Sequence, residues 1–257
     1  MRSYEDLVAE ADAADVSGWG FDWLTGRATE ERPPWGYAGL LADALAGADS
    51  ALDLQTGGGE VVGEAPLLPR RMAVTEGWPP NLERARKALA PRGVEVVDAD
   101  QDAPLPFADA SFQLVSARHP VWTNWAEIDR VLVPGGRYLG QHVGPASGFE
   151  LIERFLGPLP EEVRRARSAD QDRAGATAAG LVVDEIRSAR CLLEFFDIGA
   201  VAWTLRKLVW WVPDFSSERY AGTLRELDAL IRRDGAFVAH STRLLVRAHK
   251  PAGDLRG

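Results

Sequence analysis

Apolar segments that suit buried strands alternate with helical segments from about residue 50 to residue 144. The strand candidates are SALDL (50–54), RMAVTEG (71–77), VEVVDAD (94–100), SFQLVSARH (111–119) and RYLGQHVG (137–144). Between them, segments such as PPNLERARKALAPRG carry the prolines and glycines that begin and end helices. This alternation predicts an α/β fold in which helices cover both faces of a parallel sheet.

The whole chain of 257 residues suits one large α/β domain with a lid. We expect a single domain over 1–257, divided into an N-terminal arm and helix (1–47), a core (48–145), a helical lid insert (146–180) and C-terminal strands and helix (181–257). Two more strands are predicted at LLEFFDIGAV (192–201) and AFVAHSTRLLVRAH (236–249). The aromatic residues of the arm either line a lid or pack on the edge of the sheet: Trp19, Phe21, Trp23, Trp35 and Tyr37.

Composition narrows the functional classes. One cysteine, Cys191, excludes an internal disulfide and a cysteine-cluster metal site, so we expect no metal and a reducing, cytoplasmic location. The net charge of −9 disfavours a general nucleic-acid binder. MRSYEDLVAEAD lacks the apolar core of a signal peptide, and no stretch approaches the roughly 20 apolar residues of a membrane span.

The segment LDLQTGGGE (52–60) joins a buried strand to the next helix through three consecutive glycines. Glycine lets the backbone turn sharply and approach a ligand closely, and a helix N-terminus adds unpaired N–H groups. A dinucleotide site would need G-x-G-x-x-G, but position 62 is not glycine, so that match is poor. Glu76 ends the second strand, where a carboxylate can accept both hydroxyls of a ribose.

Over residues 50–145 the chain resembles the class I S-adenosylmethionine-dependent methyltransferases. LDLQTGGGE resembles their first motif, Asp/Glu-x-Gly-x-Gly-x-Gly, and AVTEG resembles the second. DADQDAPLPFADASFQLV is similar to the third and fourth, and EIDRVLVPGGRYLGQ to the helix and strand that follow. The resemblance implies a seven-stranded, mostly parallel Rossmann-like sheet with a lid, and S-adenosyl-L-methionine as the cofactor.

The resemblance also assigns cofactor-binding residues. Asp53 matches the motif acid that orients the methionine end, directly or through a water. Thr56, Gly57 and Gly59 supply the turn, and Glu76 is the acid that binds the ribose.

For the adenine, the resemblance implies Asp100 at the amino group, with Asp98 and Asp102 as close alternatives. Gln101 would make a backbone contact to the ring. Trp78 either covers the adenine face or caps the following helix.

Gln55 departs from the family pattern, which has its first glycine at this position. A glutamine fits there only if its φ is negative or if strain is absorbed elsewhere. We expect a tolerated variant that affects cofactor affinity more than the fold.

His119 and His142 are the candidates for a general base, because each ends a predicted strand on the ligand side of the sheet. The alternative for both is a structural role, and an acceptor that is already ionised needs no base.

The expected partner is a small, apolar or aromatic methyl acceptor, with no nucleic acid and no membrane. The alternatives are an RNA or protein methyltransferase, for which Arg164, Arg165, Arg167 and Arg173 form a basic cluster, and a non-catalytic cofactor-binding protein.

Overall fold

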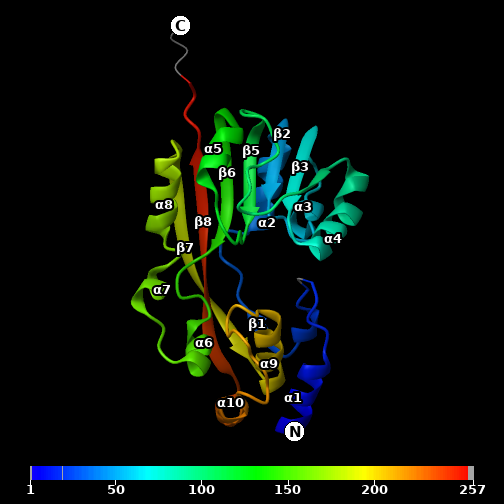
Figure 1. The fold of residues 1–257 in the computed structure, drawn as a ribbon, viewed down its shortest axis with the longest axis vertical. Helices are drawn as coiled ribbons and strands as arrows, with labels where there is room; N and C mark the ends of the chain where they lie inside the picture. The colour runs from blue at the N-terminus through cyan, green and yellow to red at the C-terminus, as the bar shows by residue number, and fades with distance from the viewer. Residues whose placement is uncertain (1, 19, 254–257) are drawn as a thin grey trace. The chain divides into compact units, whose positions relative to one another are not determined.

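The computed structural model describes residues 2–18 and 20–253, which form two compact units (Figure 1). Unit 1 contains residues 2–32 without 19, 145–166 and 190–242. Unit 2 contains residues 33–144, 167–189 and 243–253. Trp19 of the predicted arm lies outside the described residues, and the division of the chain into one domain with a lid stays a prediction.

The strands predicted between residues 50 and 144 all lie in unit 2. They are β2 (Ser50–Leu54), β3 (Arg71–Glu76), β4 (Glu95–Asp98), β5 (Phe112–Arg118) and β6 (Leu132–Val143). The sheet has the order β1-β7-β8-β6-β5-β2-β3-β4, in which β6 to β4 pair in parallel and β8 (Phe237–His249) pairs antiparallel with β6. The predicted Rossmann-like, mostly parallel fold is therefore confirmed.

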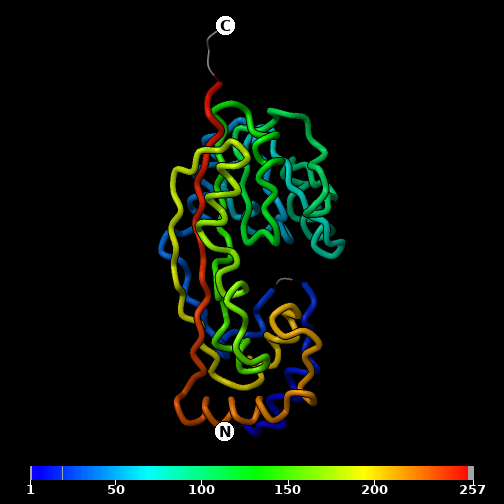
Figure 2. The backbone as a smooth tube through the Cα atoms, turned by 60° about the vertical axis from the view of Figure 1, so that its left-hand side comes forward, coloured from blue at the N-terminus to red at the C-terminus, as the bar shows by residue number. Residues whose placement is uncertain are grey.

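The sheet has eight strands, so the predicted number of seven was wrong. β1 (Ala28–Glu30) lies in the N-terminal arm and pairs antiparallel with β7 (Val182–Phe195). β7 also begins ten residues earlier than predicted and ends before residue 198. It ends there because Asp197 caps a helix, α9 (Ile198–Lys207), by accepting a 2.8 Å hydrogen bond from Ala200 N. Residues 182–189 of β7 run beside β8 in unit 2 (Figure 2).

Helices cover both faces of the sheet in unit 2. On one face lie α2 (Tyr37–Ala46), α3 (Glu60–Glu64) and α4 (Pro79–Leu89), which is followed by the short η2 (Ala90–Arg92). On the other lie α5 (Trp125–Val131) and α8 (Ala169–Ala178). Each face has its own apolar core, since alternate strand residues such as Leu114 and Val115 point to opposite sides.

Unit 1 is built around Trp203 of α9, which is 2% exposed. Its indole nitrogen donates to Asp15 O (3.0 Å), and its ring stacks on Trp23 at 5.5 Å between centroids. The Lys207 ammonium lies 5.0 Å from the same ring and donates to Gly18 O at 2.8 Å. The other elements of the unit are α1 (Tyr4–Ala13), η1 (Asp22–Leu24), α6 (Phe149–Leu156), α7 (Glu161–Arg165) and α10 (Ala221–Asp234).

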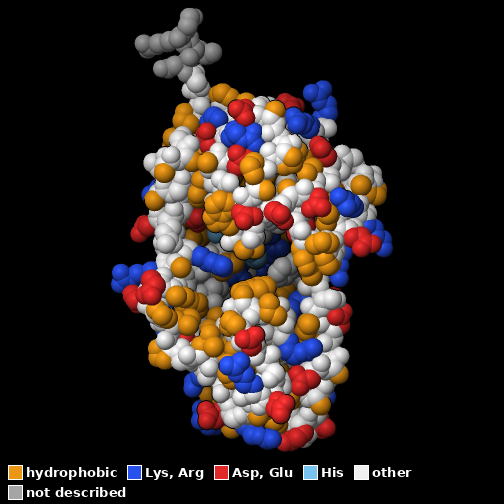
Figure 3. Space-filling model, viewed as in Figure 1, with side chains coloured by type: hydrophobic (Ala, Val, Ile, Leu, Met, Phe, Trp, Pro, Cys, Tyr) orange, Lys and Arg blue, Asp and Glu red, His pale blue; other side chains and the backbone are white. Residues whose placement is uncertain are grey.

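Acidic and basic side chains are interspersed on the face of each unit shown in Figure 3. Among residues 2–18 and 20–253, no helix combines the length and the apolar character that are needed to cross a bilayer.

Candidate functional site

The turn between β2 and α3 brings several backbone N–H groups to the carboxyl end of the sheet. Gly57 and Gly59 have φ values of 66° and 82°, in the left-handed region that glycine enters without strain. A side chain at Gly59 would also meet Leu89 Cδ1 at 2.6 Å, so glycine is needed there for packing as well. Thr56 N donates to Thr75 O at 2.9 Å and ties the turn to β3.

Glu76 lies at the centre of this turn. Its side chain is buried at the end of β3, and its two oxygens accept hydrogen bonds from Gly57 N and Trp78 N, both at 2.8 Å. The carboxylate thus joins the glycine turn to the start of α4. Each oxygen keeps a second lone pair, so the group can still accept a hydroxyl.

Asp53 is buried one strand away from Glu76. Its Oδ1 accepts a 2.6 Å hydrogen bond from the Ser116 hydroxyl of the neighbouring strand β5. Burial raises the pKa of Asp53 to about 6, although the Ser116 hydrogen bond lowers it. Ser116, which was not predicted as a site residue, lies directly opposite Asp53 in the parallel pairing of β2 and β5.

The predicted adenine residues lie around a small cavity in unit 2. Asp100 and Gln101 line it together with Leu54, Gln55 and Trp122, and its volume is about 20 Å³. Gly77 lets this loop approach β3, because a side chain there would meet Ala99 O at 2.9 Å. Trp78 is 45% exposed and is the N-cap residue of α4.

Gln55 has a positive φ of 51°, so it adopts the left-handed conformation that the family's glycine would take without strain. Its side chain reaches the loop after β5, where Oε1 accepts from Val121 N and Nε2 donates to Trp122 O, both at 2.7 Å. The expectation of a simple tolerated variant therefore omitted a contact: the amide closes the cleft between two strand ends. No sequence signal predicts this contact, since residues 55 and 121 are 66 positions apart.

His119 follows the carboxyl end of β5 and also has a left-handed backbone, with a φ of 56°. Its Nε2 lies 2.9 Å from Nε2 of Gln141 on β6, and Oε1 of Gln141 accepts a 2.8 Å hydrogen bond from the Trp35 indole. Burial lowers the pKa of His119 well below its usual value, with further lowering by Arg243, Arg118 and His142. Gln141 was not predicted as a site residue.

His142 is buried on β6, and both of its ring nitrogens have partners. Nδ1 lies 2.8 Å from Asp172 Oδ2, and Nε2 lies 2.7 Å from the Tyr138 hydroxyl. Since the carboxylate only accepts, Nδ1 carries a proton, and Nε2 of neutral His142 accepts from Tyr138. This arrangement favours the structural alternative for His142.

Gly140 leaves the space that this buried network needs. A side chain there would come within 2.5 Å of the Tyr138 hydroxyl and 2.7 Å of His142 Nε2. We therefore expect Gly140→Ala to lower the free energy of unfolding by about 2 kcal/mol, as overpacking and broken buried hydrogen bonds do. Urea denaturation measures the change. Gly39→Ala on α2 is the control, because nothing lies within 4 Å of the added carbon, and it should leave stability equal or slightly higher. Equal stability of both variants would contradict the prediction.

The described residues offer polar groups suited to an adenosyl amino acid, but the cavity beside them is too small to hold one. The buried carboxylates, the glycine turn and the buried Thr56 hydroxyl are polar groups that such a ligand can use. A cavity of about 20 Å³ holds about one water, far less than an adenosyl group. An adenosyl group therefore does not fit inside this cavity as it stands.

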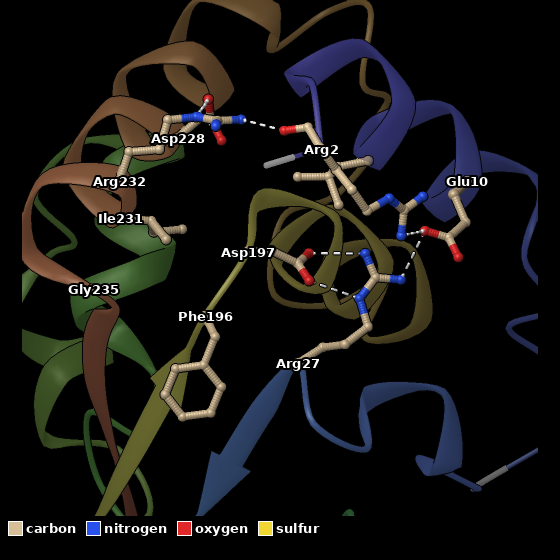
Figure 4. A pocket seen from close by; sticks show the side chains of 10 residues that line it. Arg2, Glu10, Arg27, Phe196, Asp197, Asp228, Ile231, Arg232 and Gly235 are labelled. Atoms are coloured by element: carbon tan, nitrogen blue, oxygen red, sulfur yellow. Dashed lines mark hydrogen bonds and ion pairs between the residues drawn. The ribbon is translucent and has the colours of Figure 1, made fainter.

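A second cavity, of about 490 Å³, lies within unit 1 (Figure 4). Its guanidinium groups are paired with its carboxylates: Arg27 with Asp197 and Glu10, Arg2 with Glu10, and Arg232 with Asp228. It lacks the glycine turn and the convergent strand ends of unit 2. The aromatic residues of the arm are also engaged by neighbouring groups, since Arg27 lies 3.8 Å over Trp23 while Trp35 is buried beside Gln141.

Comparisons with known proteins concern the segment that forms most of unit 2. The sequence profile of a family described as "Methyltransferase domain" matches residues 52–140. No curated protein sequence matches the chain.

Solved structures share the fold at low sequence identity. A Bacillus halodurans C-125 protein, provisionally named a methyltransferase, is 20% identical with a TM-score of 0.61, over 83% of this chain and 98% of that one. The YcgJ protein from Bacillus subtilis is 17% identical with a TM-score of 0.61, over 84% and 99%. A geranyl diphosphate methyltransferase solved with S-adenosylmethionine is 13% identical with a TM-score of 0.51, over 83% and 84%.

Proposed function

We propose that this chain is a class I S-adenosylmethionine-dependent methyltransferase that methylates a small, apolar or aromatic acceptor. Residues 52–140 match the methyltransferase-domain profile, and solved structures share the fold. The cofactor, when bound, supplies a methyl group on a positively charged sulfur, and the C–S bond breaks as the nucleophile forms its own bond to that carbon. The chain must then hold the acceptor in line and exclude water.

The turn and its carboxylates support this proposal. Glu76 would accept the ribose hydroxyls through its remaining lone pairs, while its bonds to Gly57 N and Trp78 N keep the turn in shape. Asp53 would orient the methionine end, and Asp100 and Gln101 would contact the adenine. A cytoplasmic location is part of the same proposal.

Exposed apolar side chains in unit 2 support the proposal that the acceptor is apolar or aromatic. Val121 and Trp122 follow the carboxyl end of β5 and are 63% and 49% exposed, although they lie next to the polar turn. Exposed aromatic surface beside a polar site is typical of a binding region for an apolar or aromatic ligand.

The observation that carries the proposal is the Glu76 carboxylate bonded to the glycine turn, and calorimetry tests it. We expect the purified protein to bind S-adenosylmethionine and its demethylated product, and to transfer a labelled methyl group to small aromatic phenols, carboxylates or amines. No binding at millimolar concentration of either compound would overturn the enzyme proposal.

Gln55 is the residue expected to limit cofactor affinity. We expect Gln55→Gly to bind the demethylated cofactor about tenfold more tightly, about 1.4 kcal/mol, because it removes both the left-handed strain and the amide contacts that close the cleft. Titration calorimetry measures the change. Gln55→Ala is the matched control: it removes the amide but keeps the strained side chain, so a smaller gain is expected. Weaker binding by Gln55→Gly would contradict this assignment.

The alternative of an RNA or protein methyltransferase depends on the four arginines between residues 164 and 173. In unit 1, Arg164 pairs with Glu153 and Arg165 pairs with Glu161. Pairing reduces the positive charge that a phosphate backbone would meet. Activity on RNA that is lost after charge reversal at Arg164 and Arg165 would favour this alternative.

The non-catalytic alternative is motivated by Gln55 and by the narrow cavity. Cofactor binding without transfer to any acceptor would favour it over the enzyme. Transfer of the labelled methyl group to one small molecule would exclude it.

A further inference from the structure

Three polar side chains form a continuous hydrogen-bonded row that ends at His119. Trp35 precedes α2, Gln141 is on β6, and His119 follows β5, all within unit 2. Trp35 and Gln141 are buried, with 8% and 4% of their surfaces exposed. His119 N also donates to Gln141 O at 2.6 Å, so the same residue holds both the backbone and the ring of the histidine.

The chemistry of these groups fixes the direction of each hydrogen bond. The Trp35 indole nitrogen can only donate, so the Gln141 atom 2.8 Å away must be the amide oxygen. The amide NH2 group then faces His119 Nε2 at 2.9 Å and donates to it. An accepting Nε2 carries no proton, so neutral His119 has its proton on Nδ1.

Protonation of Nε2 would disrupt this row. An Nε2–H would need the amide oxygen to turn toward it, and the NH2 group would then face the Trp35 N–H, donor against donor, in a buried place. The charged and titratable groups around the ring act in the same direction, because Arg118 on β5, Arg243 on β8 and His142 on β6 all lower the pKa of His119 after the larger effect of burial.

We propose that Trp35 and Gln141 are positioning residues that hold His119 as a neutral imidazole, so that it offers a hydrogen-bond donor at Nδ1 and does not serve as the general base. This inference rests on the proposed methyl transfer. Nδ1 makes no hydrogen bond with the described part of the chain, so it can donate to a ligand. His119 then removes no proton from the acceptor, which is an amine with a free lone pair, is already ionised, or loses its proton to another group.

Long-range proton–nitrogen NMR correlation of the 15N-labelled full chain tests the proposal without an acceptor. The method distinguishes Nδ1–H, Nε2–H and imidazolium forms, and His119→Asn assigns the signals among the four histidines. We expect His119 to be neutral at pH 7, with its proton on Nδ1. An Nε2–H or imidazolium form at pH 7 would overturn the proposal.

Two variants test whether Trp35 and Gln141 control the proton on His119 or have only a structural role. In Gln141→Glu the carboxylate accepts from both the indole and the histidine, so we expect the proton to move to Nε2 and the pKa of His119 to rise by about 1 or more. Trp35→Phe removes only the indole donor and should raise the same pKa by a smaller amount. Gln113→Glu, at an exposed position near the start of β5, is the matched control and should change neither.

If Gln141→Glu does not fold, the protonation form and pKa of His119 in Trp35→Phe test the proposal. An unchanged form and an unchanged pKa of His119 in a folded variant would contradict the proposal. Failure of the proposed function is seen separately, as absence of cofactor binding in calorimetry with the unmodified protein.

Discussion

Replacing Glu76 with glutamine should weaken binding of the demethylated cofactor about 100-fold, equivalent to about 2.7 kcal/mol. The carboxylate accepts hydrogen bonds from Gly57 N and Trp78 N at 2.8 Å, one on each oxygen. A glutamine has one oxygen, so its NH2 group would face one of these N–H donors. The turn would lose its shape, and the ribose would lose a charged acceptor. Titration calorimetry measures the affinity.

The control for this prediction is Glu95→Gln, an exposed position on β4 that should leave affinity unchanged. Thermal denaturation of Glu76→Gln shows whether the protein is still folded. Affinity that stays within about threefold of the unmodified protein, in a folded variant, would remove Glu76 from the proposed site.

Asp53→Asn should change how stability depends on pH. Burial raises the pKa of Asp53 from 3.8 to about 6. The folded protein therefore holds this proton more tightly than the unfolded chain does. The contribution to stability is fully present below pH 3.8 and is lost as the pH rises through about 6. Asparagine does not titrate, and its oxygen can still accept from Ser116.

The stability of Asp53→Asn relative to the unmodified protein should thus increase by about 2 kcal/mol between pH 4 and pH 7. Urea denaturation at several pH values measures this difference, in which the titration of all other groups cancels. Asp43→Asn, at an exposed position of α2, is expected to show no such trend. A difference for Asp53→Asn that does not vary with pH would show that folding does not raise the pKa of this carboxyl.

The site was predictable to the extent that it depends on short sequence distances. The glycine turn and Glu76 could be assigned because a strand, a turn and a second strand follow one another along the chain, and parallel strands bring their carboxyl ends together. The two histidines were harder to interpret. His119 and His142 occupy similar places at strand ends, but the partners that distinguish them, Gln141 and Asp172, come from β6 and α8.

The sequence by itself determined the α/β class, the parallel core and the position of the glycine turn, because hydrophobic periodicity and glycine conformation act over a few neighbouring residues. Only the tertiary structure decided the eighth strand, the amide contacts of Gln55 and the proton position on His119. These depend on hydrogen bonds between residues 20 to more than 100 positions apart, and their geometry exists only after the sheet has brought the strands together.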